Sequence, residues 1–288
     1  MMINSNRRVI RPADQKDLLK LANLIHYESY VHRHLDYRQP LDWVGQPQFL
    51  ILEQGQEVMA ALACPPDPPS IAWIRLFATC SRLTPAAAWK TLWAEAATQN
   101  AQNPQIGFSA AIPLYSWFES LLRESGFQKF HSIVMLSWEN TQLPTHSPSA
   151  EISIRPMTPD DLPGVQVIDE AAFTPVWQNS LTYLEIAFRQ AMWATVAETA
   201  RTLVGYQIST PTSVGGHLAR LAVLPQHQGK GIGYALLYDL LDQFNRRGAR
   251  AVTVNTQKDN YASLALYRKA GFLMTGEEYP IYQFQNQS

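Results

Sequence analysis

Hydrophobic and polar positions in the C-terminal half of the chain follow two different periods. Between residues 230 and 247 apolar positions recur at intervals of three and four, as on one face of a helix. That face carries Gly233, Leu236, Leu237, Leu240, Leu241 and Phe244. Similar patterns predict further helices over 159–173, 179–191 and 260–270. Short apolar runs predict strands over 152–156, 194–198, 203–209, 216–224, 251–255, 272–278 and 279–284. This order predicts an α+β fold with a mixed, mostly antiparallel sheet flanked by helices.

The same pattern occurs twice along the chain. The stretch IRPADQKDL begins at Ile10 and IRPMTPDDL begins at Ile154, with five identical positions of nine. At a spacing of 145 the match continues in 49–53 with 194–198, 73–78 with 218–223, and 125–127 with 270–272. A long repeat that occurs twice indicates a tandem domain duplication rather than a solenoid. We therefore predict domains over 1–138 and 151–288, joined by a linker over 139–150 that is rich in Pro, Ser and Thr.

Composition excludes several classes of protein. The 288 residues include 23 basic and 24 acidic ones, so no basic surplus indicates a nucleic-acid partner. No apolar run approaches the ~20 residues needed to cross a bilayer, and no signal-peptide pattern follows the start. Cys64 and Cys80 lie among apolar or small residues without metal-binding spacing, which indicates buried free thiols and no metal site. These features predict a soluble, cytoplasmic protein that binds neither nucleic acid nor a membrane.

The segment 228–233, Gln-Gly-Lys-Gly-Ile-Gly, lies where a predicted strand ends and a predicted helix begins. A helix N-terminus offers free N–H groups and a positive dipole end, and glycines let a ligand approach the backbone, which suits a pyrophosphate. A dinucleotide fingerprint is excluded because the sixth position counted from Gly229 is Tyr234. A P-loop is excluded because its first glycine would have to stand at Leu224. The remaining alternative to an anion site is a tight strand-to-helix turn.

These residues resemble the acetyl-CoA signature of the GNAT superfamily of N-acetyltransferases, which has the form Q/R-x-x-G-x-G/A. A second motif supports the resemblance, since NYASLALYRKAGF at 260–272 is similar to the family's Asn, apolar helix, Tyr and Gly-Phe. The order and spacing of the two motifs agree with the family, and the resemblance covers about 152–285. It implies the acyl-CoA N-acyltransferase fold, and the internal repeat extends this fold to the N-terminal half as a tandem pair.

The resemblance also implies how acetyl-CoA would bind as cosubstrate. Main-chain amides from Gln228 to Gly233 would bind the pyrophosphate, and the strand at Val223 would pair with the pantetheine as an extra strand would. This strand and the one at 251–255 would splay apart to admit the thioester. The residues assigned to acetyl-CoA are Leu221, Ala222, Val223, Gln228, Gly229, Lys230, Gly231, Ile232, Gly233, Asn255, Asn260 and Tyr267.

Several of these positions also have ordinary structural explanations. Asn260 suits a helix N-cap as well as a contact with the cofactor arm. Tyr267 would stand near the sulfur and act as general acid, although a lone tyrosine is often a core aromatic. A phenol of pKa ~10 is a reasonable partner for a thiolate of pKa ~8.5. Lys230 is either a solvated loop charge or a phosphate contact.

The general base is less closely defined. Some relatives carry Glu at the position of Asn255, where the amide cannot accept a proton. His217, on the strand before the loop, is the first candidate because an imidazole has a pKa of ~6.5. Glu198 is a second and weaker candidate, and Glu170 is a candidate for lining the acceptor site. The aromatic residues considered for the acceptor pocket are Phe173, Trp177 and Tyr206.

The N-terminal half serves as an internal control. At a spacing of 145 the glycine loop falls on 83–88, Asn260 on Tyr115 and Tyr267 on Leu122. Glu198 falls on Glu53, so this acid is present in the half without a loop, which favours a structural role. His217 falls on Ala72 and is peculiar to the C-terminal half. We expect one competent site, in the C-terminal half, and a degenerate N-terminal domain.

The expected activity is transfer of an acetyl group from acetyl-CoA to a primary amine by direct attack. The acceptor would be a small molecule, an amino acid or a peptide. The alternative is a module that binds acetyl-CoA as a sensor or interaction surface without turnover. If the N-terminal repeat replaces a dimer partner, the protein is a monomer.

Overall fold

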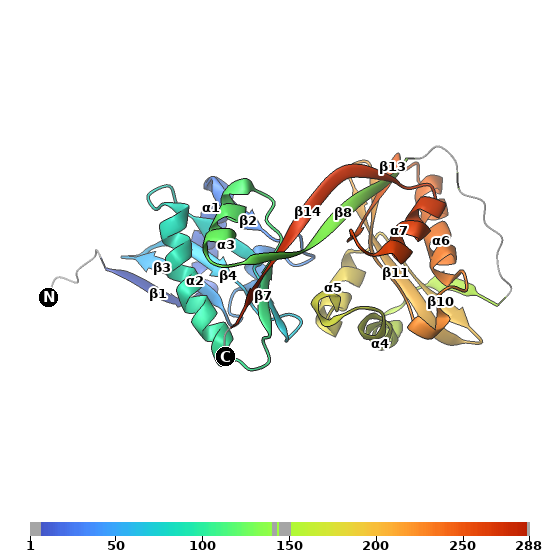
Figure 1. Ribbon diagram of the computed structural model, residues 1–288, viewed down its shortest axis with the longest axis horizontal. Helices are drawn as coiled ribbons and strands as arrows, with labels where there is room; N and C mark the ends of the chain where they lie inside the picture. Colours follow the sequence, from blue (N-terminus) through green and yellow to red (C-terminus); the bar gives the residue numbers. More distant parts are fainter. Residues whose placement is uncertain (1–6, 140–142, 144–150, 287–288) are drawn as a thin grey trace. The chain divides into compact units, whose positions relative to one another are not determined.

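The computed structural model consists of two compact units, which Figure 1 shows in sequence colours. The residues described are 7–139, 143 and 151–286. Unit 1 comprises Met1–His131 and Tyr279–Ser288, and unit 2 comprises Ser132–Glu278. Unit 2 thus includes residues 132–138, which the repeat pattern assigns to the N-terminal domain. Most of the predicted linker, at 140–142 and 144–150, lies outside the described residues. Within the described part of the chain, no helix is long and apolar enough to cross a membrane.

Unit 2 combines antiparallel strands with one parallel pair. Its helices are α4 (Leu162–Ala172), α5 (Leu181–Gln190), α6 (Ile232–Arg246) and α7 (Tyr261–Lys269), with short 3-10 helices η3 (Pro159–Asp161), η4 (Pro175–Trp177) and η5 (Pro225–His227). Its own strands are β9 (Ser153–Pro156), β10 (Trp193–Thr199), β11 (Thr202–Thr212), β12 (Gly215–Val223) and β13 (Ala251–Gln257). Strands β9 to β12 pair antiparallel, whereas β12 and β13 are parallel. The predicted mixed, mostly antiparallel sheet is confirmed.

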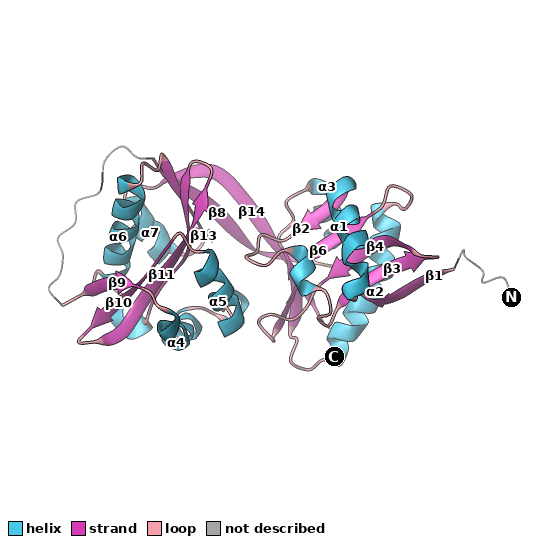
Figure 2. Cartoon of the chain, turned by 180° about the vertical axis from the view of Figure 1, so that it is seen from behind, coloured by secondary structure: helices cyan, strands magenta, loops and turns pink. Residues whose placement is uncertain are grey.

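Helices cover both faces of the unit 2 sheet (Figure 2). The apolar face predicted for α6 is buried, and Leu237, Leu240 and Phe244 pack with Val252 and Val254 of β13. Helix α7 joins the same cluster, while α4 and α5 pack against the strands from the opposite face. The 3.6-residue period therefore predicts the face of α6 that contacts the sheet.

Two long strands run between the units, β8 (Gln128–Glu139) and β14 (Leu273–Gln285). Residues 133–139 of β8 pair antiparallel with β13 and extend the unit 2 sheet. Residues 282–285 of β14 pair antiparallel with β7 in unit 1. Two strands were expected here, at 272–278 and 279–284, but β14 is one continuous strand that lies between β7 and β8 in the strand order.

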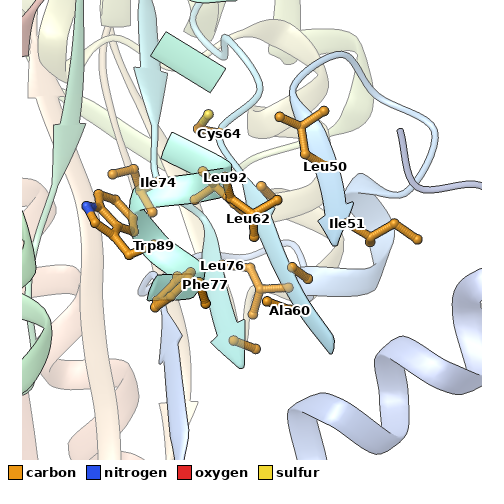
Figure 3. Close-up of a cluster of buried hydrophobic side chains, with 14 of the residues drawn as sticks. Leu50, Ile51, Ala60, Leu62, Cys64, Ile74, Leu76, Phe77, Trp89 and Leu92 are labelled. Atoms are coloured by element: carbon orange, nitrogen blue, oxygen red, sulfur yellow. The ribbon is translucent and has the colours of Figure 1, made fainter. Parts of the chain in front are cut away.

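Unit 1 repeats much of this order, but the segment after its first helix forms a strand and a 3-10 helix instead of η4 and α5. Its strands are β1 (Arg8–Pro12), β2 (Tyr30–Arg33), β3 (Phe49–Gln54), β4 (Glu57–Ala63), β5 (Ile71–Trp73), β6 (Leu76–Thr79) and β7 (Phe108–Ala111). Its helices are α1 (Leu18–Tyr27), α2 (Pro85–Gln102) and α3 (Ser116–Glu124), with η1 (Gln15–Asp17) and η2 (Pro40–Trp43). One antiparallel sheet has the order β1-β3-β4-β6-β2. Its core gathers buried side chains of the strands and α2, among them Leu62, Phe77 and Trp89 (Figure 3).

A salt-bridge network is present in both units and supports the duplication. Its members are Arg11, Asp17 and Glu53 in unit 1, and Arg155, Asp161 and Glu198 in unit 2. In unit 2 the guanidinium lies 2.7 Å from the aspartate and 2.8 Å from the glutamate. In unit 1 the corresponding distances are 2.7 and 2.9 Å. In both units the network joins the first strand and the turn before the first helix to one further strand, which is β3 in unit 1 and β10 in unit 2.

The spacing of the repeat changes by one residue within the sheet. Ala61 and Tyr206 are equivalent at a spacing of 145, but their partners in the next strand, Ala78 and Ala222, are 144 apart. The spacing of 145 predicted for this strand is therefore wrong by one residue. The cause is the preceding connection, which is one residue longer in unit 1.

Candidate functional site

Strands β12 and β13 run side by side for four residue pairs and then separate. Gly215–Leu218 pairs with Ala251–Val254, and beyond that point β12 pairs with β11 while β13 pairs with β8. The register of β12 against β11 shifts at Ala219, an extra residue that marks a β-bulge. A cavity of about 150 Å³ lies where the two strands diverge. Its wall includes Phe173, Trp177, Arg220, Leu221, Asn255, Asn260 and Tyr267.

The main chain of β12 beyond the bulge is paired on one side. Leu224 N–H donates to Val204 O at 2.8 Å, which fixes the alternation of the ladder with β11. The main-chain groups of Ala222 therefore point toward β11, and those of Leu221 and Val223 point away from it. In the described residues no strand pairs with this second edge. The predicted splay thus leaves free main-chain donors and acceptors at Leu221 and a free donor at Val223.

The glycine loop follows directly. Gly229 and Gly231 have φ values of 74° and 85°, in the left-handed region that favours glycine. A Cβ at either position would meet nothing within 4 Å, so the space outside the loop is open. Gln228 folds back onto the strand, and its Nε2 donates to Val223 O at 3.0 Å. Because α6 begins at Ile232, the N–H groups of its first turn lack partners within the helix.

The other loop residues differ in what they expose. Lys230 is exposed, as a solvated charge would be. The side chain of Ile232 is buried against the sheet, so only its main chain can face a ligand. A Cβ at Gly233 would lie 3.4 Å from the side chain of Leu266, an ordinary packing distance.

Helix α7 directs two polar side chains at the cavity. Asn260 is the N-cap, since its Oδ1 accepts from Ser263 N at 3.1 Å, and its Nδ2 donates to Gln257 Oε1 at 3.2 Å. Asn260 also lines the cavity, so the cap and the cavity position are compatible. Tyr267, two turns further, is 5% exposed and lines the same cavity. Burial raises the pKa of Tyr267, so its hydroxyl keeps its proton at neutral pH.

Asn255 carries an unsatisfied polar atom. Its Oδ1 is buried and has no hydrogen-bond partner among the described residues. Asn255 follows Val254, the last residue of β13 that pairs with β12, and lines the cavity. Leaving such an acceptor unpaired costs about 1–3 kcal/mol. A ligand with an N–H or O–H group would remove this cost.

A buried polar cluster holds Arg220 at the cavity wall. Asp169 of α4 is fully buried, and its Oδ2 accepts from Arg220 Nε at 2.7 Å and from the Tyr206 hydroxyl. Arg220 also donates to Trp177 O, and its guanidinium lies 3.5 Å from the centre of the Phe173 ring. Asp169 was not among the predicted site residues, although an aspartate on the apolar face of a helix was a usable signal.

Three candidate acids and bases lie elsewhere. His217 is in the paired part of β12, where its Nδ1 lies 2.8 Å from Thr253 Oγ1, and burial lowers its pKa. Glu198 belongs to the duplicated network with Arg155. Glu170 is an exposed residue of α4. None of these three side chains lines the cavity as the described residues form it.

Comparisons with known proteins agree with this geometry. Residues 162–272 match the model of the Acetyltransferase (GNAT) family. The N-alpha-acetyltransferase RimI of Mycobacterium tuberculosis is 40% identical over 84 residues, which are 28% of this chain and 51% of that protein. N-alpha-acetyltransferase 30 of Schizosaccharomyces pombe is 32% identical over 71 residues, which are 25% of this chain and 47% of that protein. The chain thus spans about half the length of these relatives.

Two solved structures resemble the whole chain in fold. A tandem GNAT protein from the clavulanic acid biosynthesis pathway has a TM-score of 0.64 at 16% identity and covers 98% of this chain and 99% of its own. A GCN5-related N-acetyltransferase from Sphaerobacter thermophilus has a TM-score of 0.63 at 16% identity, covering 100% of this chain and 98% of its own. The predicted tandem fold is therefore confirmed, and the part of the chain that matches the GNAT family model, residues 162–272, includes the glycine loop and helix α7.

Proposed function

We propose that unit 2 is an acetyl-CoA-dependent N-acetyltransferase. The observation that carries this proposal is the free edge of β12 beside a glycine loop, with Tyr267 at the wall of the same cavity. Main-chain groups of Leu221 and Val223 suit the amides of an extended pantetheine arm, as in β-strand addition. The unpartnered N–H groups at the start of α6, with the open space beside Gly229 and Gly231, suit its pyrophosphate. The residues present therefore fit acetyl-CoA.

In this proposal Tyr267 is the general acid. Acetyl-CoA supplies an activated thioester, and the acceptor amine forms a C–N bond to its carbonyl carbon as the C–S bond breaks. The Tyr267 hydroxyl donates its proton to the departing sulfur, which completes free CoA. Burial raises the pKa of Tyr267, so the phenol carries its proton at neutral pH when the thiolate forms, and the phenolate left after the transfer regains a proton from water.

The amine is proposed to enter as its free base. Among the described residues, the ionisable side chains that line the cavity are Arg220 and Tyr267, and neither is a base at neutral pH. The unpartnered Oδ1 of Asn255 would accept an N–H of the neutral amine and orient its lone pair. After attack the nitrogen loses its extra proton to water.

The acceptor is proposed to be a primary amine of a small molecule, an amino acid or a peptide. The named activities of the curated relatives, both N-alpha-acetyltransferases, favour a peptide N-terminus. The aromatic side chains of Phe173 and Trp177 at the cavity wall would pack against apolar atoms next to the amine. We also propose that the protein is monomeric, with unit 1 in the place of a second subunit.

A thiol-release assay tests the proposal. Full-length protein is mixed with acetyl-CoA and a panel of amines that includes peptides with free N-termini, and free CoA is measured. Release that depends on both the amine and the enzyme is expected, with an acetylated amine as product by mass spectrometry. If acetyl-CoA binds in calorimetry but no amine is acetylated, unit 2 is a sensor instead of an enzyme.

A further inference from the structure

The five-stranded sheet of unit 1 has two edges, and they are built differently. At β1 the main-chain groups of Arg8, Ile10 and Pro12 face outward, because Ala13 N–H donates to Phe49 O and fixes the alternation with β3. Pro12 therefore stands on this edge without an N–H group, which is a common protection against unwanted pairing. At β2 no proline is present.

The outward main-chain groups of β2 belong to Val31 and Arg33. His34 N–H donates to Arg75 O at 3.0 Å, so the main-chain groups of His34 and His32 point toward β6. Those of the alternate residues Arg33 and Val31 point away from it. Among the described residues no backbone hydrogen bond uses the N–H or C=O groups of Val31 or Arg33. Strand β2 thus presents two donor–acceptor pairs in the spacing of a strand template.

A pocket lies along this edge within unit 1. Its volume is about 830 Å³, and both Val31 and Arg33 line it. The wall also includes Tyr115, which is 53% exposed, and Trp117 at the start of α3. The buried Nδ1 of His34 lies at the same wall without a hydrogen-bond partner in the described residues. The free edge therefore faces a space large enough for several residues, with aromatic surface beside it.

The charges of the pocket favour an acidic ligand. The carboxylate of Asp36 is already bonded to Arg75 at 2.9 Å, and that of Glu28 accepts from Ser81 N at 2.9 Å. Arg33 uses one donor, from Nη2 to Ile25 O at 2.8 Å, and keeps its remaining N–H groups free. The pocket thus keeps free guanidinium N–H groups, while both of its carboxylates already accept hydrogen bonds.

Arg38 adds a second guanidinium to the same pocket. Its nearest acid is Asp67, at 3.8 Å, and its group stacks 3.8 Å from the centre of the Trp43 ring. A guanidinium held in this way is pre-oriented for a carboxylate.

We propose that unit 1 binds an extended acidic peptide segment, which adds to β2 as a further strand. The peptide's main chain pairs with Val31 and Arg33, its carboxylates face Arg33 and Arg38, and its apolar side chains pack on Tyr115 and Trp117. The site is separate from the proposed acetyl-CoA site, so its test does not depend on acetyl transfer.

The test measures binding of a designed peptide to the full-length protein. A fluorescein-labelled decapeptide of alternating glutamate and valine should raise its anisotropy saturably, and its lysine-for-glutamate counterpart should bind at least about tenfold more weakly. Val31→Pro removes one outward N–H and spares the ladder with β6, so it should weaken binding about three- to tenfold. Arg8→Pro makes the same change on the opposite edge and should leave the affinity unchanged.

If Val31→Pro fails to fold, two further results test whether the peptide binds along β2. The double variant Arg33→Gln/Arg38→Gln should lose binding of the glutamate peptide, and amide exchange in residues 30–33 should slow when that peptide is added. Failure of both peptides to bind at millimolar concentration overturns the proposal. Equal binding of the peptide to Val31→Pro and to the unaltered protein overturns it as well. Displacement of the labelled peptide by free glutamate as effective as that by unlabelled peptide also overturns it, because it would indicate a small carboxylate ligand.

Discussion

Units 1 and 2 use the segment after their first helix in different ways. Helices α1 and α4 begin at equivalent positions, Leu18 and Leu162. In unit 2 the following segment forms η4, and Phe173 and Trp177 stand at the cavity wall. In unit 1 the equivalent residues form β2, and Tyr30–Arg33 pair with β6. The strand edge that unit 2 leaves open is thus occupied by the chain itself in unit 1.

The turn into the next helix differs in the same sense. Unit 2 has residues 224–231 between strand and helix, whereas unit 1 has only 80–84. The N-cap of α2 is Thr84, whose hydroxyl accepts from Ala87 N at 3.3 Å, but α6 begins after a glycine without a side-chain cap. Unit 1 therefore satisfies with its own atoms the groups that unit 2 leaves for a ligand. Glycines introduced into the turn at 80–84 would therefore not free the edge of β6 that pairs with β2.

The largest expected effect in unit 2 is that of Tyr267→Phe. If Tyr267 protonates the departing thiolate, kcat should fall about 10²- to 10⁴-fold, while the dissociation constant for acetyl-CoA changes little. Steady-state kinetics and calorimetry measure the two quantities. Tyr261→Phe is the matched control, because this tyrosine lies on the same helix and is 77% exposed. Unchanged turnover in Tyr267→Phe would remove the phenol from the mechanism.

Glycine substitutions separate ligand binding from backbone strain. Gly231 and Gly248 both have left-handed φ values, 85° and 73°, and both have open space around them. Alanine at either position should cost about 1–2 kcal/mol of stability. Only Gly231→Ala should also weaken acetyl-CoA, by about tenfold or more, because a methyl group there blocks the approach to the first turn of α6. Equal affinities of the two variants for acetyl-CoA in calorimetry would argue against a phosphate site in the loop.

The sequence predicts features of the fold that depend on local periodicity. The buried face of α6 and the duplication follow from apolar patterning and the internal repeat, whereas the break in β12–β13 pairing is what the family resemblance implies. The sequence does not predict that β8 and β14 contribute residues to both units. An extended segment carries no local signal for the unit with which it pairs. The role of β2 in unit 1 is likewise not predicted, because its pairing with β6 joins residues more than 40 positions apart in the chain.

The candidate site was predictable to a similar extent. The Asn260–Tyr267 interval locates one wall of the cavity, since both residues lie on α7 or at its N-cap, and the glycine spacing locates the loop before α6. The partner of Arg220 was not found, because Asp169 is 51 residues away in the chain and meets it only through packing of α4 on β12. The unsatisfied Oδ1 of Asn255 is likewise a property of the folded cavity.

A buried histidine makes the stability of unit 1 sensitive to acid. In unit 1, burial lowers the pKa of His32 to about 3, far below its value of ~6.5 in an unfolded chain. Between these values the unfolded state binds one more proton, so stability falls as the pH drops, by about 1.4 kcal/mol per pH unit for this residue. Urea unfolding between about pH 5 and 6.5 should show this slope, and His32→Phe should reduce it by about that amount. Above about pH 7 the stabilities of His32→Phe and of the unaltered protein should depend on pH in the same way. An unchanged slope in the variant below that pH would contradict a lowered pKa for His32.

The smallest expected effect concerns the first candidate for a base. His217 bonds to Thr253 in the paired part of β12 and does not line the cavity that the described residues form, so His217→Gln should change kcat/KM less than about threefold. With a neutral amine as substrate, the pH profile of kcat/KM should follow the pKa of the acceptor, and it should shift when a peptide amine is replaced by a more basic alkylamine. Glu198→Gln serves as the comparison, because it should lower stability through Arg155 without changing the pH profile. A loss of about 100-fold or more in His217→Gln, with a pH profile independent of the acceptor, would instead make this imidazole the general base through an intervening water.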